Sequence, residues 1–172
     1  MAGDLLLKYG TAAALTTTNL DGIASSATWV AGWTSGQINN TSVLADDYMI
    51  SGTFTVESAG LSAGIILVLA YAAFDSTPTW PDLFSAGTEG SEGTATINAA
   101  LIRDSGFVRL AAITTDTTAS RAYPFAPVSI RDAFGFVPPY FAIYVAQSTG
   151  TTLETTGTPN KLYQVPIFGS YT

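Results

Sequence analysis

The 172-residue chain contains no cysteine and no histidine. Without cysteine there is no disulfide framework, no thiol nucleophile and no cysteine-based metal site. Without histidine, Ser-His-Asp and Cys-His catalysis are excluded, together with most zinc, copper and non-haem iron sites. The sequence therefore lacks the side chains on which most familiar enzyme chemistry depends.

Charged residues are also scarce, and most of those present are acidic. They make up 11% of the chain, with 13 Asp and Glu against 6 Lys and Arg and a net charge of −7, whereas soluble domains average about 25% charged residues. The acidic balance disfavours binding to nucleic acid and to anionic membranes. A surface so poor in charge is typical of a subunit that hides part of its exterior against neighbours.

The sequence has no hydrophobic run of transmembrane length. Its most apolar segment, residues 63–74, is too short, because a spanning helix needs about twenty residues. Asp4 precedes the short apolar run at the N terminus, so the positive region of a secretory signal is missing. We interpret residues 63–74 as a strand buried on both faces or a short buried helix.

The periodicity of hydrophobic residues predicts an all-β protein. Residues 48–57 alternate apolar and polar side chains, as a half-buried antiparallel strand does. The glycine-rich turn at residues 60–64 favours pairing of this strand with residues 63–74. Further strands are expected at residues 27–33, 94–98, 107–115, 139–146 and 161–171. This pattern predicts a single antiparallel β-sandwich of jelly-roll type over residues 1–172, with residues 1–20 as a candidate N-terminal arm and Leu5 to Tyr9 as a short strand or part of that arm.

Residues 121–150 contain the strongest local constraints on backbone conformation in the sequence. Four prolines, at positions 124, 127, 138 and 139, rule out one long helix or one long central strand. Ser129 is suited to cap a helical turn and Gly135 to end it. We expect one short helical turn near residues 129–134 between two strands. Pro166 further on predicts a sheet edge or a bulge.

Carboxylate pairs are the remaining candidates for catalysis in a chain without histidine. The pairs are Asp46 with Asp47, Glu89 with Glu92, and Asp104 with Asp132. Acidic pairs in turns are usually solvated, and neither a phosphate-binding loop nor a nucleophile elbow is present. We therefore predict a protein that is not an enzyme and that carries no cofactor.

The long loop at residues 75–93 allows two interpretations. Its four carboxylates, those of Asp75, Asp82, Glu89 and Glu92, are oxygen ligands of the kind calcium prefers, but their spacing matches no known calcium loop. In the second interpretation the loop folds its aromatic residues onto a neighbouring strand or subunit. We favour the second and predict no metal site.

Aromatic residues supply most of the candidate scaffold or interface positions. Trp29 and Trp33 are expected to fill a core or an interface, with a sugar-stacking platform as the alternative. The arginines are better suited to salt bridges or interface hydrogen bonds than to catalysis. The candidate scaffold or interface residues are Trp80, Phe84, Arg121, Tyr123, Phe125, Arg131, Phe134, Phe136 and Tyr140.

Three segments carry a family resemblance. They are TWPDLFSAGTEG, VRLAAITTDTTASRAYPFAPVSIRDAFGFVPPYFAIYVAQSTGTTL and NKLYQVPIFGSY, within roughly the last hundred residues. In this order they resemble a family of small structural proteins of tailed bacteriophages that accompany the major capsid protein. The most specific part is RAYPFAPVS with the following FG, PPYFAIYV and STG.

The resemblance implies a virion protein that decorates or cements the capsid shell. Its expected partners are the major capsid protein lattice and further copies of itself, for example as a trimer, and neither nucleic acid nor a membrane. Its expected location is the capsid surface of the virion, after assembly in the host cytoplasm. The alternatives are a phage tail or baseplate subunit and a carbohydrate-binding jelly-roll module in which Trp29, Trp33, Trp80 or Tyr123 stacks on sugars.

Overall fold

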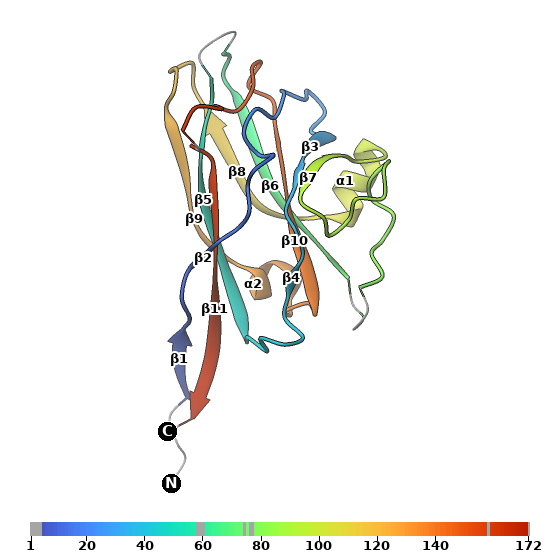
Figure 1. Ribbon diagram of the computed structural model, residues 1–172, viewed down its shortest axis with the longest axis vertical. Coiled ribbons are helices and arrows are strands. Elements are labelled where there is room, and N and C mark those ends of the chain that lie inside the picture. Colours follow the sequence, from blue (N-terminus) through green and yellow to red (C-terminus); the bar gives the residue numbers. More distant parts are fainter. Residues whose placement is uncertain (1–4, 58–60, 74, 76–77, 158, 172) are drawn as a thin grey trace.

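The computed structural model describes residues 5–57, 61–73, 75, 78–157 and 159–171. In this part of the chain two antiparallel sheets lie face to face, so the protein is the all-β sandwich that the sequence predicts (Figure 1). The helices described are two short ones, α1 (Ala100–Gly106) and α2 (Ile130–Phe134). Neither is long and apolar enough to cross a membrane.

The first sheet contains both ends of the described chain. Its main path has the order β1 (Leu5–Tyr9), β11 (Lys161–Tyr171), β5 (Asp47–Thr55) and β9 (Ala122–Ser129). The short β2 (Ala13–Ala14) also pairs with β11. We call these strands the five-stranded sheet.

The second sheet is built around two strands that are buried on both faces. Its order is β7 (Gly93–Thr96), β3 (Ala31–Thr34), β10 (Tyr140–Gln147), β6 (Gly64–Ala73) and β8 (Val108–Thr115), and β4 (Ile38–Asn39) pairs with β10. We call these strands the six-stranded sheet. The prediction of a strand buried on both faces at residues 63–74 is confirmed for β6, and Phe74 lies outside the described residues.

The main core lies between the two sheets. Alternate residues of β5 and β11, such as Phe54 and Leu162, point into it and are fully buried. From the opposite sheet Ile66, Phe141 and Ile143 meet them. This alternation is the period of two that the sequence shows at residues 48–57.

A second apolar cluster covers the outer face of the six-stranded sheet. Tyr71 and Tyr144 point outward from β6 and β10 and are nevertheless fully buried. They are covered by Phe84 and Ile102, from the loop before β7 and from α1. The loop at residues 75–93 thus folds its aromatic residues onto neighbouring strands of its own chain.

The expected pairing between β5 and β6 is wrong. β5 pairs with β11 and β9, whereas β6 pairs with β10 and β8 in the other sheet. Because β6 must be covered on both faces, it takes a central position in the six-stranded sheet, and the chain crosses between sheets to reach it.

Two further local expectations need correction. The strand expected at residues 27–33 begins only at Ala31, because Trp29 has a φ of 53°, which no strand allows. Helix α1 was not predicted at all. Its N-cap position is Ala99, which has no side-chain hydrogen bond to offer, so the usual start signal is absent.

The prediction for residues 129–135 is confirmed in detail. Ser129 Oγ accepts a hydrogen bond from the Asp132 amide at 2.9 Å, and Gly135 ends α2 with a φ of 81°. Pro166 differs from expectation, because β11 has neighbours on both sides. Pro166 lies in β11 between the part that pairs with β1 and the part that pairs with β2. The Gly10 amide donates to the Pro166 carbonyl at 2.8 Å. Because strand pairing on this side of β11 is already interrupted here, the amide hydrogen that proline lacks breaks no continuous ladder.

Candidate contact surfaces

Glu89 and Glu92, one of the acidic pairs considered for catalysis, accept hydrogen bonds that position the long loop. Glu89 Oε1 accepts hydrogen bonds from the amides of Leu83 and Phe84 at 2.8 and 2.7 Å. Glu92 accepts from Trp33 Nε1 at 2.8 Å and from Asn19. Burial of Glu92 opposes its charged form, but these hydrogen bonds outweigh burial and hold its pKa below the usual value. Both glutamates therefore fix the long loop in place.

One residue from each of the other two acidic pairs, Asp47 and Asp104, is also engaged locally. Asp47 accepts from Ser129 Oγ at 2.7 Å and from the Arg131 amide at 2.8 Å, which ties α2 to β5. Asp104 forms an ion pair with Arg103 at 2.6 Å. Among the residues the structure describes, no group of three or more carboxylates is placed to hold a metal ion.

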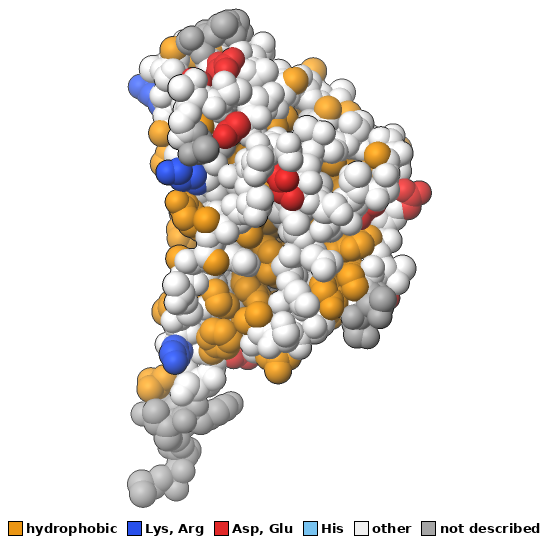
Figure 2. Space-filling view, in the orientation of Figure 1, with side chains coloured by type: hydrophobic (Ala, Val, Ile, Leu, Met, Phe, Trp, Pro, Cys, Tyr) orange, Lys and Arg blue, Asp and Glu red, His pale blue; other side chains and the backbone are white. Residues whose placement is uncertain are grey.

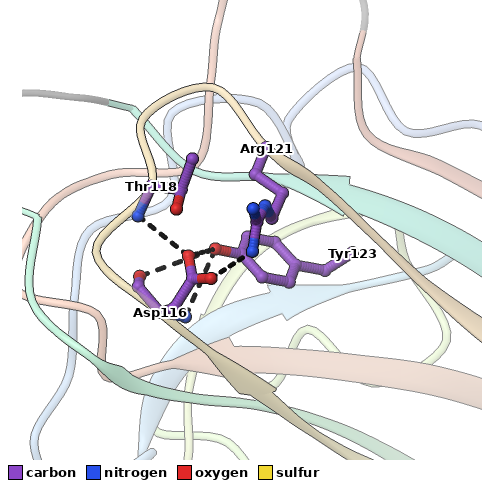
Figure 3. A network of polar contacts seen from close by, with 4 residues as sticks. All are labelled: Asp116, Thr118, Arg121 and Tyr123. Atoms are coloured by element: carbon purple, nitrogen blue, oxygen red, sulfur yellow. Dashed lines mark hydrogen bonds and ion pairs between the residues drawn. The ribbon is translucent and has the colours of Figure 1, made fainter.

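Arg121 and Tyr123 belong to a polar network at the turn between β8 and β9 (Figure 3). Asp116 accepts hydrogen bonds from the Thr118 amide and the Tyr123 hydroxyl, both at 2.8 Å, and forms an ion pair with Arg121. The Thr118 amide is the main cause that lowers the pKa of Asp116. Since β8 and β9 lie in different sheets, the network holds the two sheets together at this end of the sandwich.

The aromatic candidates divide between scaffold and surface. Phe84, Tyr123 and Tyr140 are buried. Phe125 stacks on Phe54 with ring centroids 6.0 Å apart, and half-buried Trp80 packs edge-on against Tyr71.

The remaining candidates come from α2 and the residues after it. Arg131 is exposed, Phe134 is half-buried and Phe136 is 44% exposed. The two phenylalanines line an apolar hollow of about 430 Å³ with Pro81 and Phe107.

The second apolar cluster contains a buried hydroxyl that responds to alkaline pH. Tyr71 Oη is 2.7 Å from Thr34 Oγ1 and accepts from the Gly90 amide at 2.9 Å. Burial raises the pKa of Tyr71 to about 12 from 10.0. The unfolded chain therefore loses this proton near pH 10, while the folded chain keeps it until about pH 12.

We expect stability to fall between pH 10 and 12, by about 2 kcal/mol for Tyr71 alone. Below pH 10 both states carry the proton, so its contribution there is constant. Urea unfolding at pH 10 and 12 measures the loss, and Tyr71→Phe is the control. The phenylalanine variant should lose less stability over this interval, and an identical loss in both proteins would contradict the assignment.

Of the residues considered for sugar stacking, Trp29 lines a cleft. Trp33 is fully buried and Tyr123 is 8% exposed. Trp29 borders an open cleft of about 460 Å³ with Leu67 and Arg109, on the outer side of the six-stranded sheet. The guanidinium of Arg103 lies 5.7 Å from the centroid of the Trp29 ring and occupies part of its surface. Sequence reasoning missed this cleft because Arg103 belongs to the unpredicted α1.

The outer face of the five-stranded sheet is less covered than that of the six-stranded sheet. From Met49 to Thr53 of β5 and from Lys161 to Val165 of β11, outward positions alternate with core residues; the six outward residues are Met49, Ser51, Thr53, Lys161, Tyr163 and Val165. Lys161 is the one charged residue among these six, and Tyr163 is 37% exposed. Figure 2 views the sandwich edge-on: charged side chains are sparse on this side, and the basic ones visible lie along the edge of the five-stranded sheet.

Comparisons with protein-family models, with curated proteins and with solved structures found no match.

Proposed function

We propose that this protein is a non-enzymatic virion subunit that decorates or cements the capsid shell of a tailed bacteriophage. The observation that carries the proposal is the outer face of the five-stranded sheet, which is less covered than that of the six-stranded sheet. The outer side of the six-stranded sheet carries an apolar cluster, and the chain covers it with the long loop and α1. The other sheet keeps Met49, Tyr163 and Val165 half-buried or exposed, as a surface reserved for contact does.

The chemistry of this face suits a protein lattice better than the other partner classes. Hydroxyl and apolar side chains dominate the outward positions of β5 and β11, and low charge is typical of the centre of protein interfaces. With a net charge of −7 the chain repels nucleic acid and anionic lipid. A cement protein needs a stiff scaffold and repeated contacts with an assembled shell rather than an active site.

Co-sedimentation with purified shells of the virus that encodes the protein tests the proposal. The wild-type chain should bind in a fixed stoichiometry and raise the temperature at which the shells disrupt. Tyr163→Glu places a charge on the proposed contact face and should weaken binding at least tenfold. Leu101→Glu is the matched control, because Leu101 is 81% exposed on α1, outside the other sheet. Shells that stay bare at micromolar protein contradict the proposal.

A tail or baseplate subunit and a carbohydrate-binding module are the alternatives. The tail subunit would use the same contact face, and only the position in the virion separates it from a shell protein. Carbohydrate binding depends on the Trp29 cleft, where Arg103 already lies against the indole ring. A tryptophan fluorescence signal that does not change across a panel of glycans argues against that module.

A further inference from the structure

Strand β1 is an unprotected edge of the five-stranded sheet. It pairs with β11 on one side and with no other strand in the described part of the chain. The opposite edge, β9, contains Pro124 and Pro127, which remove backbone donors and hinder the addition of another strand. β1, with the sequence LLLKY, contains no proline. One edge is therefore blocked, whereas the other is open to pairing.

The open edge extends beyond the body of the sandwich. β11 pairs with β5 as far as Ile167, and its pairing with β1 runs from Ile167 to Tyr171. The last part of β11 therefore has β1 as its one strand partner and forms a two-stranded ribbon that projects from the molecule (Figure 1). A two-stranded ribbon alone is marginally stable in water, and three or more strands are needed for independent stability.

The ribbon also exposes apolar side chains on both of its faces. Leu6 is 51% exposed and Leu7 is 61% exposed, and successive residues of a strand point to opposite faces. Tyr9, on the same face as Leu7, is 65% exposed. The ribbon thus combines an open edge with leucine and tyrosine side chains left in solvent.

We propose that β1 pairs antiparallel with β1 of a second copy of this chain, around a two-fold axis midway between the two copies of Leu7. The second copy brings its own β11 as well, so the two ribbons form a four-stranded sheet in the order β11, β1, β1, β11. A single peptide strand from another partner would add only one strand. The pairing joins the five-stranded sheets of two copies and does not depend on capsid binding.

The register follows from the chemistry of five residues. A two-fold axis normal to the sheet keeps each side chain on its own face, and residues directly opposite each other must point to the same face. One residue of β1 must therefore lie directly opposite its own copy. An axis at Leu7 aligns the whole of β1 and places Lys8 opposite Leu6 of the second copy. An axis at Lys8 would instead place two lysines directly opposite each other, which is destabilising. Lys8 is the one charged residue of β1, so no acidic groups of this strand approach each other.

The absence of cysteine makes this register directly testable in the full-length chain. In the proposed dimer the two copies of position 7 are neighbours, with Cα atoms about 4.5–5.5 Å apart, within the range of a disulfide. The two copies of position 9 are about 14 Å apart, since four residues of strand separate position 9 from position 5 opposite it. Leu7→Cys should form a disulfide-linked dimer under mild oxidation at least tenfold faster than Tyr9→Cys.

The two variants are matched because both residues are exposed and lie on one face of the same strand. Random collisions would therefore oxidise both at similar rates. Non-reducing electrophoresis measures dimer formation, and thermal melting of the reduced proteins confirms that both variants are folded. Equal rates for the two variants, or the absence of a dimer with Leu7→Cys, overturn the proposed pairing. Shell binding is measured separately by co-sedimentation. A negative result in either experiment therefore contradicts one proposal and leaves the other unaffected.

Discussion

Replacing Phe84 by alanine is expected to lower the free energy of unfolding by about 3–5 kcal/mol, even though Phe84 lies in a long loop. Its ring is 1% exposed and meets Tyr71 edge-on at a centroid distance of 5.4 Å. It also stacks on Tyr144 at 5.6 Å and contacts Phe107 at 5.9 Å. Truncation removes this packing and leaves a cavity on the outer side of the six-stranded sheet, which rigid neighbouring strands cannot close.

Phe136→Ala is the matched control for this experiment. Phe136 is 44% exposed and comes from another candidate segment of the sequence, so its loss should cost about 1 kcal/mol. Urea unfolding of both variants gives the comparison. Similar losses for the two phenylalanines would contradict the assignment of Phe84 to a second core and of Phe136 to the surface.

Gly32→Ala is expected to destabilise the protein by about 2–3 kcal/mol through overpacking. A Cβ atom at Gly32 would lie 2.2 Å from the Val145 carbonyl oxygen and 2.8 Å from the Tyr144 hydroxyl. Neither group is free to move, because Val145 is in central strand β10 and Tyr144 donates to the Val30 carbonyl at 2.7 Å. Only glycine allows β3 and the Tyr144 side chain to approach so closely.

Gly36→Ala provides the control for the Gly32 variant. A Cβ atom at Gly36 would have no other atom within 4 Å, and its φ is not in the left-handed region. Alanine there should leave stability unchanged or raise it by up to about 1 kcal/mol, because it restricts the unfolded chain. Thermal unfolding of both variants separates the two cases, and equal destabilisation would contradict the close approach at Gly32.

Local signals in the sequence were sufficient where a strand or turn depends on its own residues. The alternation at residues 48–57 and the continuous apolar run of β6 predict these strands, because one is covered on one face and the other on both. The Ser129 cap and the Gly135 terminus of α2 were also predictable from the sequence, since each relies on the preference of one residue.

Pairing between distant strands was not predictable in the same way. The glycine turn before β6 looks like a hairpin, but two apolar faces on β6 require neighbours on both sides, and these are β10 and β8. No local sequence pattern identifies which strands these neighbours are. Helix α1 was missed because it is seven residues long and has no capping side chain, so neither its period nor its start is visible in the sequence.

The candidate residues show the same limit. Their aromatic character indicated contact, but not whether the contact lies inside the chain. Phe84 and Tyr140 are buried, whereas Phe136 remains at the surface. The proposed contact face of the five-stranded sheet was not predicted, because Met49, Tyr163 and Val165 come from two segments more than a hundred positions apart that only the sheet brings together.

A cryo-EM reconstruction of a tailed-bacteriophage virion whose genome encodes this chain tests the functional proposal most directly. The account predicts that the β-sandwich fits density repeated over the outer surface of the capsid shell, with the outer face of the five-stranded sheet against the major capsid protein. Density for the sandwich only in the tail or baseplate, or a shell whose density is fully explained without this chain, would contradict it.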